Sequence, residues 1–376
     1  MLIPHLDRFT SLHSTSPRRR PARLAAAVVI ASALAVSACG GDSTPRYLDG
    51  AAAGIYGGEC AGSTGNEIAI YSGRTENLIR PVLDAFACEK GIDVAVRWGG
   101  STDLALLLAE EGDRTAADVF LSRSPGPVGF LESQDLLGTI DPEVLELVEP
   151  QNHSASGTWV GFSGRKRVLV YNIDSYAPDE LPQSVFDLTD ERFRGQVAIP
   201  ATNGSFIDWF TVFRDQYGSD VAAEWLSDMV DNDARYYPNN RSIVEAAGRG
   251  EIEMGLVNHY YQYQEAAAEG DSHRASNWDL ADDDIGSLLI ITAATVTASS
   301  ERTDEANELL SYLLSESVQR YFSEETFEYP LAAGVQPVDI LPPLQALEIG
   351  SVDFDALGGG FAETTAIIEA SGILNQ

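Results

Sequence analysis

The chain has 376 residues, which is too long for one small domain and suits two domains of ordinary size, since domains cluster near ~100 to 150 residues. A hydrophobic content of 44% with 22% charged residues is the balance of a folded protein and excludes global disorder or a collagen-like chain. Acidic residues (57) outnumber Lys and Arg (24), for a net charge of −33, so neither a nucleic acid nor an anionic membrane surface is expected as a partner.

The first 38 residues have the pattern of an export signal. Four arginines (Arg18, Arg19, Arg20 and Arg23) precede an apolar run over 24–36, which is too short to span a bilayer at about 20 residues per crossing. The run ends in Val-Ser-Ala followed by Cys39, which resembles the lipobox of bacterial lipoproteins. We therefore predict that residues 1–38 are a lipoprotein signal peptide and that Cys39 carries the lipid. The alternative is a plain secretory signal in which the cysteine is incidental.

Residues 39–66 are rich in Gly, Ser, Thr and Ala, and we predict that they form a lipidated flexible tether. Cys60 and Cys88 are the other two cysteines, and an exported protein lies where disulfides persist. Cys60 lies just before a predicted strand, and Cys88 lies near the end of the helix that follows this strand. We expect them to pair, which would contribute about 3 kcal/mol by the chain-entropy estimate. Two buried free thiols are the alternative.

After residue 66 the chain alternates strand and helix signals. A β-rich run at 67–73 precedes a helix in which apolar residues from Leu78 to Phe86 recur at helical spacing. A strand at 92–98, a helix that begins near Ser101 or Thr102, and a strand at 117–122 follow. Repeated βα units predict a mostly parallel sheet that binds ligands at the carboxyl ends of its strands.

A second series begins with strands at 167–174 and 195–200. Helices are predicted near 206–217, 220–230 and 242–249, strands at 253–258 and 287–298, and one long helix over 304–322. Two α/β lobes joined by crossover strands fit this order better than one large sheet. We assign 67–165 with 287–341 to the first lobe, and 166–286 with 342–376 to the second.

No residue set in the chain supports catalysis. The five histidines include no His-x-x-x-His pair, and the segment 161–165 (GFSGR) lacks the Gly-x-Ser-x-Gly pattern of a nucleophile elbow. Neither a Gly-rich phosphate loop with Lys nor a Cys-x-x-Cys motif is present. We therefore expect a protein that binds a ligand and is not an enzyme.

The segment GLVNHYYQY carries the most informative side chains. Asn258, His259, Tyr260 and Tyr261 come directly after a strand that reads as buried, where an α/β lobe presents residues to a ligand. Fe(III) is a hard cation that prefers anionic oxygen, and it can deprotonate a phenol whose free pKa is about 10. Paired tyrosines at a strand end also serve as packing residues. For His259 we favour an outward polar side chain over a metal ligand.

From IAIYSGR at 68–74 through EYPL at 328–331, the chain resembles the ferric-iron-binding proteins, the substrate-binding subunits of bacterial iron ABC importers. The resemblance is most specific over 197–206, 236–261 and the late EYP. It implies a two-lobed type II periplasmic-binding-protein fold of the α/β class, with hinge strands between the lobes. It also implies that Tyr260 and Tyr261 bind Fe(III), and that a synergistic anion is held by Asn203, Gly204, Ser205, Asn240 and Asn258. A helix N-terminus is in addition a ready anion site.

The chain departs from this family at first-lobe positions. Many relatives have a His where this chain has Thr75, and some have a Glu where it has Arg123. Other relatives have a tyrosine near the position of Phe206. Glu76 is a further candidate ligand, although it also reads as a first-turn helix charge. Arg74 and Arg123 are expected to close on the anion, because guanidinium groups bind oxyanions bidentately. We expect that anion to be carbonate, phosphate or citrate-like.

The sequence therefore predicts a monomeric lipoprotein at the outer face of the cytoplasmic membrane or in the periplasm. It would bind Fe(III) with a synergistic anion and deliver it to an ABC permease and its ATPase, with the lipid anchor as its only membrane contact. The alternatives are a receptor for an organic anion, an iron chelate or a polyamine on the same fold. A ligand-sensing lipoprotein without a transport role is a third possibility.

Overall fold

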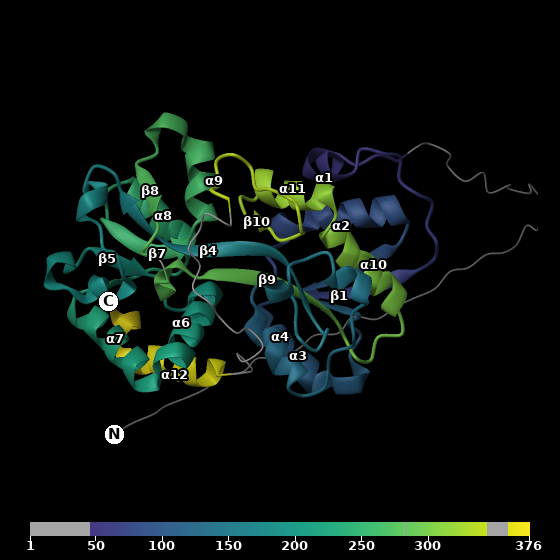
Figure 1. The fold of residues 1–376 in the computed structure, drawn as a ribbon, viewed down its shortest axis with the longest axis horizontal. Helices are drawn as coiled ribbons and strands as arrows, with labels where there is room; N and C mark the ends of the chain where they lie inside the picture. Colours follow the sequence, from purple (N-terminus) through teal and green to yellow (C-terminus); the bar gives the residue numbers. More distant parts are fainter. Residues whose placement is uncertain (1–45, 282, 344–359) are drawn as a thin grey trace, which may run out of the picture. The chain divides into compact units, whose positions relative to one another are not determined.

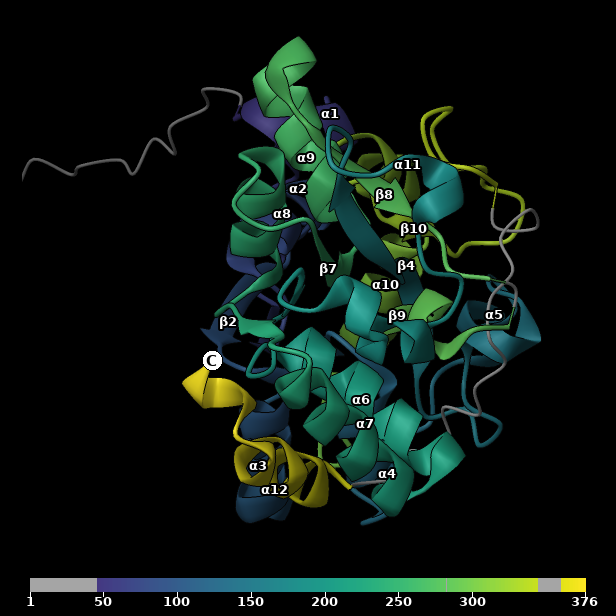
Figure 2. The ribbon, with the colours of Figure 1, turned by 90° about the vertical axis from the view of Figure 1, so that its left-hand side faces the viewer.

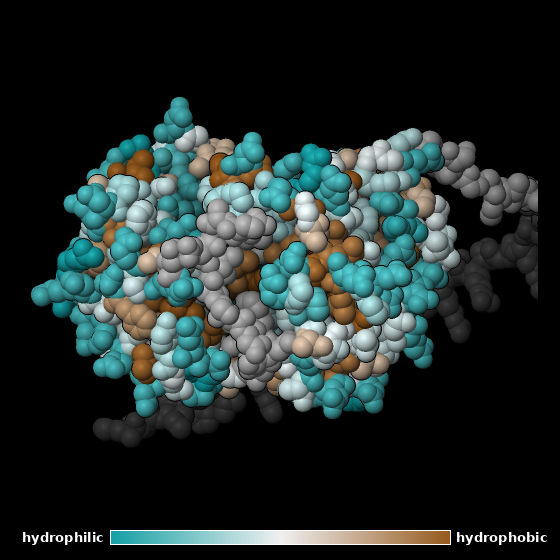
Figure 3. Space-filling view, in the orientation of Figure 1, coloured by the Kyte–Doolittle hydropathy of each residue, from teal (hydrophilic) through white to brown (hydrophobic). Residues whose placement is uncertain are grey.

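The computed structural model describes residues 46–281, 283–343 and 360–376. The predicted signal peptide and the lipidation of Cys39 lie outside the described residues. No helix in the described ranges is long and apolar enough to cross a membrane. Hydrophilic residues cover most of the face drawn in Figure 3, with hydrophobic residues gathered in smaller patches, as expected for a strongly acidic chain.

The strands form a mixed sheet in the order β2-β1-β3-β9-β4-β7-β5-β6, and β8 and β10 also pair with β4. The central strand is β4 (Val160–Asn172), all of which is buried. Its first half pairs antiparallel with β9 (Leu289–Val296) and β10 (Tyr329–Pro330). Its second half pairs with β7 (Met254–Asn258) and β8 (Ala275–Trp278). The long strands β4 and β9 lie side by side (Figure 1) and are the crossover strands that the sequence predicts.

Helices cover both faces of the first half of the sheet. Parallel strands β1 (Glu67–Ser72), β2 (Asp93–Trp98) and β3 (Val119–Ser122) carry alternating apolar side chains. Ile70 and Leu121 face one core, and Tyr71 and Phe120 face the other. The first core is completed by α2 (Glu76–Lys90), α10 (Thr303–Leu313) and α11 (Glu316–Glu324). The second is completed by α3 (Ser101–Glu111) and α4 (Pro125–Glu132).

The second half repeats this arrangement around β7, β5 (Val197–Ile199) and β6 (Arg235–Tyr236). Leu169 and Leu256 point to a core rich in aromatic residues, whereas Val168 and Val257 point to the opposite face. The aromatic core is formed with α6 (Gly204–Tyr217), α7 (Ser219–Asp231) and α12 (Phe361–Ser371), which are grouped together in Figure 2. The opposite face is covered by α8 (Asn240–Gly248).

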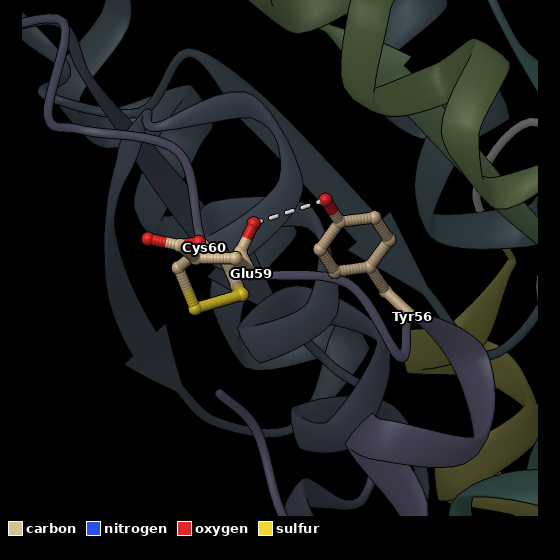
Figure 4. The surroundings of a disulfide bond; sticks show 4 residues. Tyr56, Glu59 and Cys60 are labelled. Carbon is tan, nitrogen blue, oxygen red and sulfur yellow. Dashed lines mark hydrogen bonds between the residues drawn. A yellow bond between two sulfur atoms is a disulfide. The ribbon is translucent and has the colours of Figure 1, made fainter. Parts of the chain in front are cut away.

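Residues 46–66 differ from the prediction, because they pack on the first half and do not form a free tether. Ile55 of α1 (Gly50–Ile55) is buried in the first core, and the Cys60 amide donates to the Arg46 carbonyl over 2.8 Å. Cys60 and Cys88 form a disulfide, and the nearby Tyr56 hydroxyl donates to the Glu59 carbonyl (Figure 4). The segment is therefore fastened by apolar burial and by a covalent bond to α2.

The single helix expected over 304–322 was also wrong, because the chain forms α10 and α11 there. Ser315 takes an extended conformation with ψ of 150° and separates the two helices. A further short helix, α5 (Pro142–Leu145), lies before β4.

Candidate functional site

The two adjacent tyrosines begin a helix directly after a central strand. β7 ends at Asn258, and Tyr260 is the first residue of α9 (Tyr260–Glu269). The Tyr260 side chain is buried, Tyr261 is partly exposed, and the two rings stack with their centroids 4.2 Å apart. The positive end of the α9 dipole favours negative charge on groups at this position. The fold therefore places the two phenols side by side at a helix N-terminus.

Without a cation at the site, Tyr260 keeps its proton. Burial raises the pKa of the Tyr260 phenol well above its ordinary value, the neighbouring Tyr261 raises it further, and Arg165 acts in the opposite direction. A bound multivalent cation reverses this balance, because it stabilises the phenolate directly.

The side chains predicted to hold an anion form one hydrogen-bonded network. Asn203 caps α6, and its Oδ1 accepts from the Ser205 amide over 3.1 Å. The Asn240 side-chain nitrogen donates to both Asn203 Oδ1 and Ser205 Oγ, each over 3.1 Å. Arg167 Nη1 lies 3.0 Å from Asn258 Oδ1 and 3.4 Å from Asn240 Oδ1, which joins Asn258 to the same group.

Arg123 lies against this network. It follows β3 of the first half, yet a Cβ atom built on Gly204 would lie 3.4 Å from Arg123 Nη2. Its guanidinium group therefore sits beside the N-terminus of α6, in the second half. The start of α6 belongs to the predicted anion site, and the sequence predicts that Arg123 binds the same anion.

Arg74 has a different partner from the predicted one. Its Nη1 and Nη2 donate to Glu328 Oε1 and Oε2 over 3.0 and 2.8 Å, and both side chains are fully buried. Burial disfavours ionisation of Glu328, but Arg74, Arg165 and the Ser163 hydroxyl together outweigh burial, so the pKa of this carboxyl lies below its ordinary value. The charge of Arg74 is therefore balanced within the protein.

Glu76 is exposed and accepts a hydrogen bond from Arg80 one helical turn later, over 2.6 Å. This is the first-turn helix charge that the sequence left as the alternative. Within residues 46–281, 283–343 and 360–376, no group of three or more His, Cys, Asp or Glu side chains is arranged to hold a metal. A cation at this site would depend on the phenols and on oxygen atoms of an anion.

His259 is a buried packing residue, so the prediction of an outward polar side chain was wrong. Its Nδ1 accepts from the Lys166 amide of β4 over 3.1 Å, and its ring stacks on Tyr329 with centroids 4.9 Å apart. Burial lowers the pKa of His259 to about 4, so the ring is neutral near pH 7. The residue therefore holds the turn before the two tyrosines against the central strand β4.

Sequence reasoning missed Arg165 and Arg167, two buried cations on β4. Arg165 is 2% exposed, and its Nε and Nη2 atoms have no hydrogen-bond partner in the described part of the chain. Burial lowers its pKa, while the nearby Tyr260 raises it. For Arg167, burial and then Arg165 lower the pKa to about 9. The available signal was the pattern Arg-Lys-Arg in an apolar strand, because alternate residues of a strand share a face.

Comparisons with known proteins agree with this fold and identify the family of the chain. The family profile of the bacterial extracellular solute-binding proteins matches residues 114–354. The Fe(3+)-binding periplasmic protein of Serratia marcescens is 28% identical over 298 residues, which cover 79% of this chain and 88% of that protein.

Solved structures are similar over most of the described chain. Iron-bound HitA from Pseudomonas aeruginosa is 30% identical with a TM-score of 0.76, and the match covers 82% of this chain and 99% of HitA. Trichodesmium FutA, solved with iron and citrate ligands, is 24% identical with a TM-score of 0.70 over 82% and 99% of the two chains. The predicted type II periplasmic-binding-protein fold is confirmed.

Proposed function

The chain belongs to the bacterial extracellular solute-binding proteins, and we propose that it binds Fe(III) with a synergistic anion through Tyr260 and Tyr261. Members of this family are transport components and not enzymes. In this role the protein is the exported receptor of an ABC importer, lipid-anchored at Cys39, which delivers its cargo to the permease.

The single observation that carries the proposal is the stacked phenol pair at the start of α9, beside the Asn203 network. Phenolate oxygen suits Fe(III), and the amide network with the α6 N-terminus suits an anion that completes the coordination sphere. The names of similar proteins support the same cargo, since HitA was solved with iron and FutA with iron and citrate.

A second candidate function is a receptor for an organic anion without iron. It is favoured by the arginines near the tyrosines, since Arg165 is buried with two unpartnered nitrogens and Arg123 lies beside the α6 N-terminus. A polyamine would be repelled by these groups, so it is disfavoured.

Substitution of the phenols tests the proposal. We expect Tyr260→Phe and Tyr261→Phe each to weaken Fe(III) binding by more than the roughly 10- to 100-fold typical of losing an outer-shell partner, because each removes a ligand oxygen. Affinity is measured by competition with a chelator of known iron affinity. Tyr217→Phe, at a partly exposed site on α6, is the matched control. Unchanged iron affinity in a variant that carries both Tyr260→Phe and Tyr261→Phe would exclude the paired-tyrosine site.

A further inference from the structure

The C-terminal helix α12 is fixed to the second half of the protein. Ile368 is buried in the aromatic core that α12 shares with α6 and α7, and Figure 1 shows α12 beside these helices. Near the start of α12, the side chain of Glu363 accepts hydrogen bonds from Arg214 and from the Ser219 hydroxyl. Because the helix is held at several points, its first residue, Phe361, has a defined place.

The side chain of Phe361 contacts the first half of the protein. A Cβ atom added to Gly126, at the start of α4, would overlap the Phe361 ring. Glycine destabilises a helix relative to alanine, and the φ angle of Gly126 is not positive, so the backbone conformation does not require a glycine here. The useful property of Gly126 is therefore its lack of a side chain, which lets the ring lie against the backbone of α4.

This contact continues the approach of the two halves that begins at the ligand site. Gly204, the first residue of α6, lies beside Arg123 of the first half. Two helical turns later, on the same face of α6, Val212 lines a small cavity together with the start of α4, the crossover strand β9 and Phe361. The first half therefore meets one face of α6 from the ligand site outwards, and Phe361 lies at the far end of this interface.

We propose that Phe361 is a latch between the two halves, which packs on Gly126 and stabilises the converged arrangement before any ligand binds. The ring meets α4 in the same arrangement in which Arg123 lies beside α6. Separation of the halves along this interface would expose the ring to water, and burial of an aromatic ring favours the converged arrangement. This inference goes beyond the proposed function, because it does not depend on which ligand the site binds.

Distances between the two halves of the ligand-free protein test this inference. Pulsed electron spin resonance measures them between spin labels at Leu106→Cys on α3 and Val221→Cys on α7, whose native side chains are 54% and 39% exposed. We expect Phe361→Ala to shift the ratio of converged to separated molecules about 5- to 10-fold towards separated molecules, because one partly buried aromatic contact is lost. A ligand held by both halves should bind more weakly by at most this factor.

Gly126→Ala makes the complementary change in the other half. Its methyl group displaces the Phe361 ring and favours the helical conformation of α4, so we expect the same shift without loss of the helix. In the Phe361→Ala protein the added methyl group has no ring to displace. A variant with both changes should therefore behave like Phe361→Ala alone.

Two controls match these variants. Gly54→Ala adds a methyl group to a helical glycine at which nothing lies within 4 Å of the new atom. Phe186→Ala removes a ring that is 37% exposed and packs on Phe213 within the second half. Neither control should change the distances between the labels.

Unchanged distances in both Phe361→Ala and Gly126→Ala would overturn the inference. A shift towards shorter distances would also overturn it, because the ring would then hold the halves apart. Additive shifts in the variant with both changes would show that the two residues do not act through one contact. The expected shifts in a protein that fails to bind iron would contradict the proposed function and support the latch.

Discussion

The properties of Tyr260 predict how iron binding depends on pH. Its pKa is raised by burial, so the phenol is protonated near pH 7 and must lose its proton to ligate Fe(III). With two ligating phenols, we expect about two protons to be released for each iron bound, and iron affinity to fall as the pH falls. A pH indicator in weakly buffered solution measures the release.

Tyr261→Phe should release about one proton fewer than the unmodified protein. Proton release that is the same in the two proteins would show that Tyr261 does not ligate the metal.

At the same scale, the sequence predicted some site residues and missed others for a physical reason. Asn258 ends one strand and Tyr260 and Tyr261 come directly after it, so local sequence shows them together. The partner of Arg74 is 254 residues away, and the orphan edge of Arg165 appears only when β4 is buried between its neighbours. Contacts between distant segments carry no local signal.

At the scale of elements, the spacing of apolar residues predicted most strands of the sheet and most helices that cover it. It failed where tertiary contacts or a single cap decide the structure. Residues 46–66 are rich in small polar residues, yet the side chain of Ile55 and the disulfide fix them to the first core. The helical pattern over 304–322 continues through Ser315, although the backbone does not.

The disulfide should stabilise the first half of the protein without affecting the ligand site. We expect Cys60→Ser with Cys88→Ser to lower the free energy of unfolding by about 2 to 5 kcal/mol, because the open chain gains loop entropy. Cys88 lies near the end of α2, a helix length from the Arg74 loop, so iron affinity should stay the same. Urea unfolding under non-reducing conditions measures the change, with Ser133→Ala at an exposed site as a control. An unchanged unfolding free energy would show that α1 packing alone holds the segment.

At the scale of the whole molecule, the candidate ligand contacts come from three places in the fold. Arg123 follows β3 of the first half, Arg165 lies on the crossover strand β4, and the tyrosines begin α9 in the second half. A ligand held by all three stabilises the arrangement in which these groups converge. Such differential binding is how a hinged receptor shifts its population towards the closed state.

The most direct test of the central claim is a visible absorption titration of the chelator-stripped protein with Fe(III), with and without citrate, phosphate and bicarbonate. Phenolate ligation predicts a phenolate-to-iron charge-transfer band that saturates near one equivalent of iron and depends on the anion supplied. The absence of this band with every anion would contradict iron binding by Tyr260 and Tyr261, and the organic-anion receptor would then be the better account.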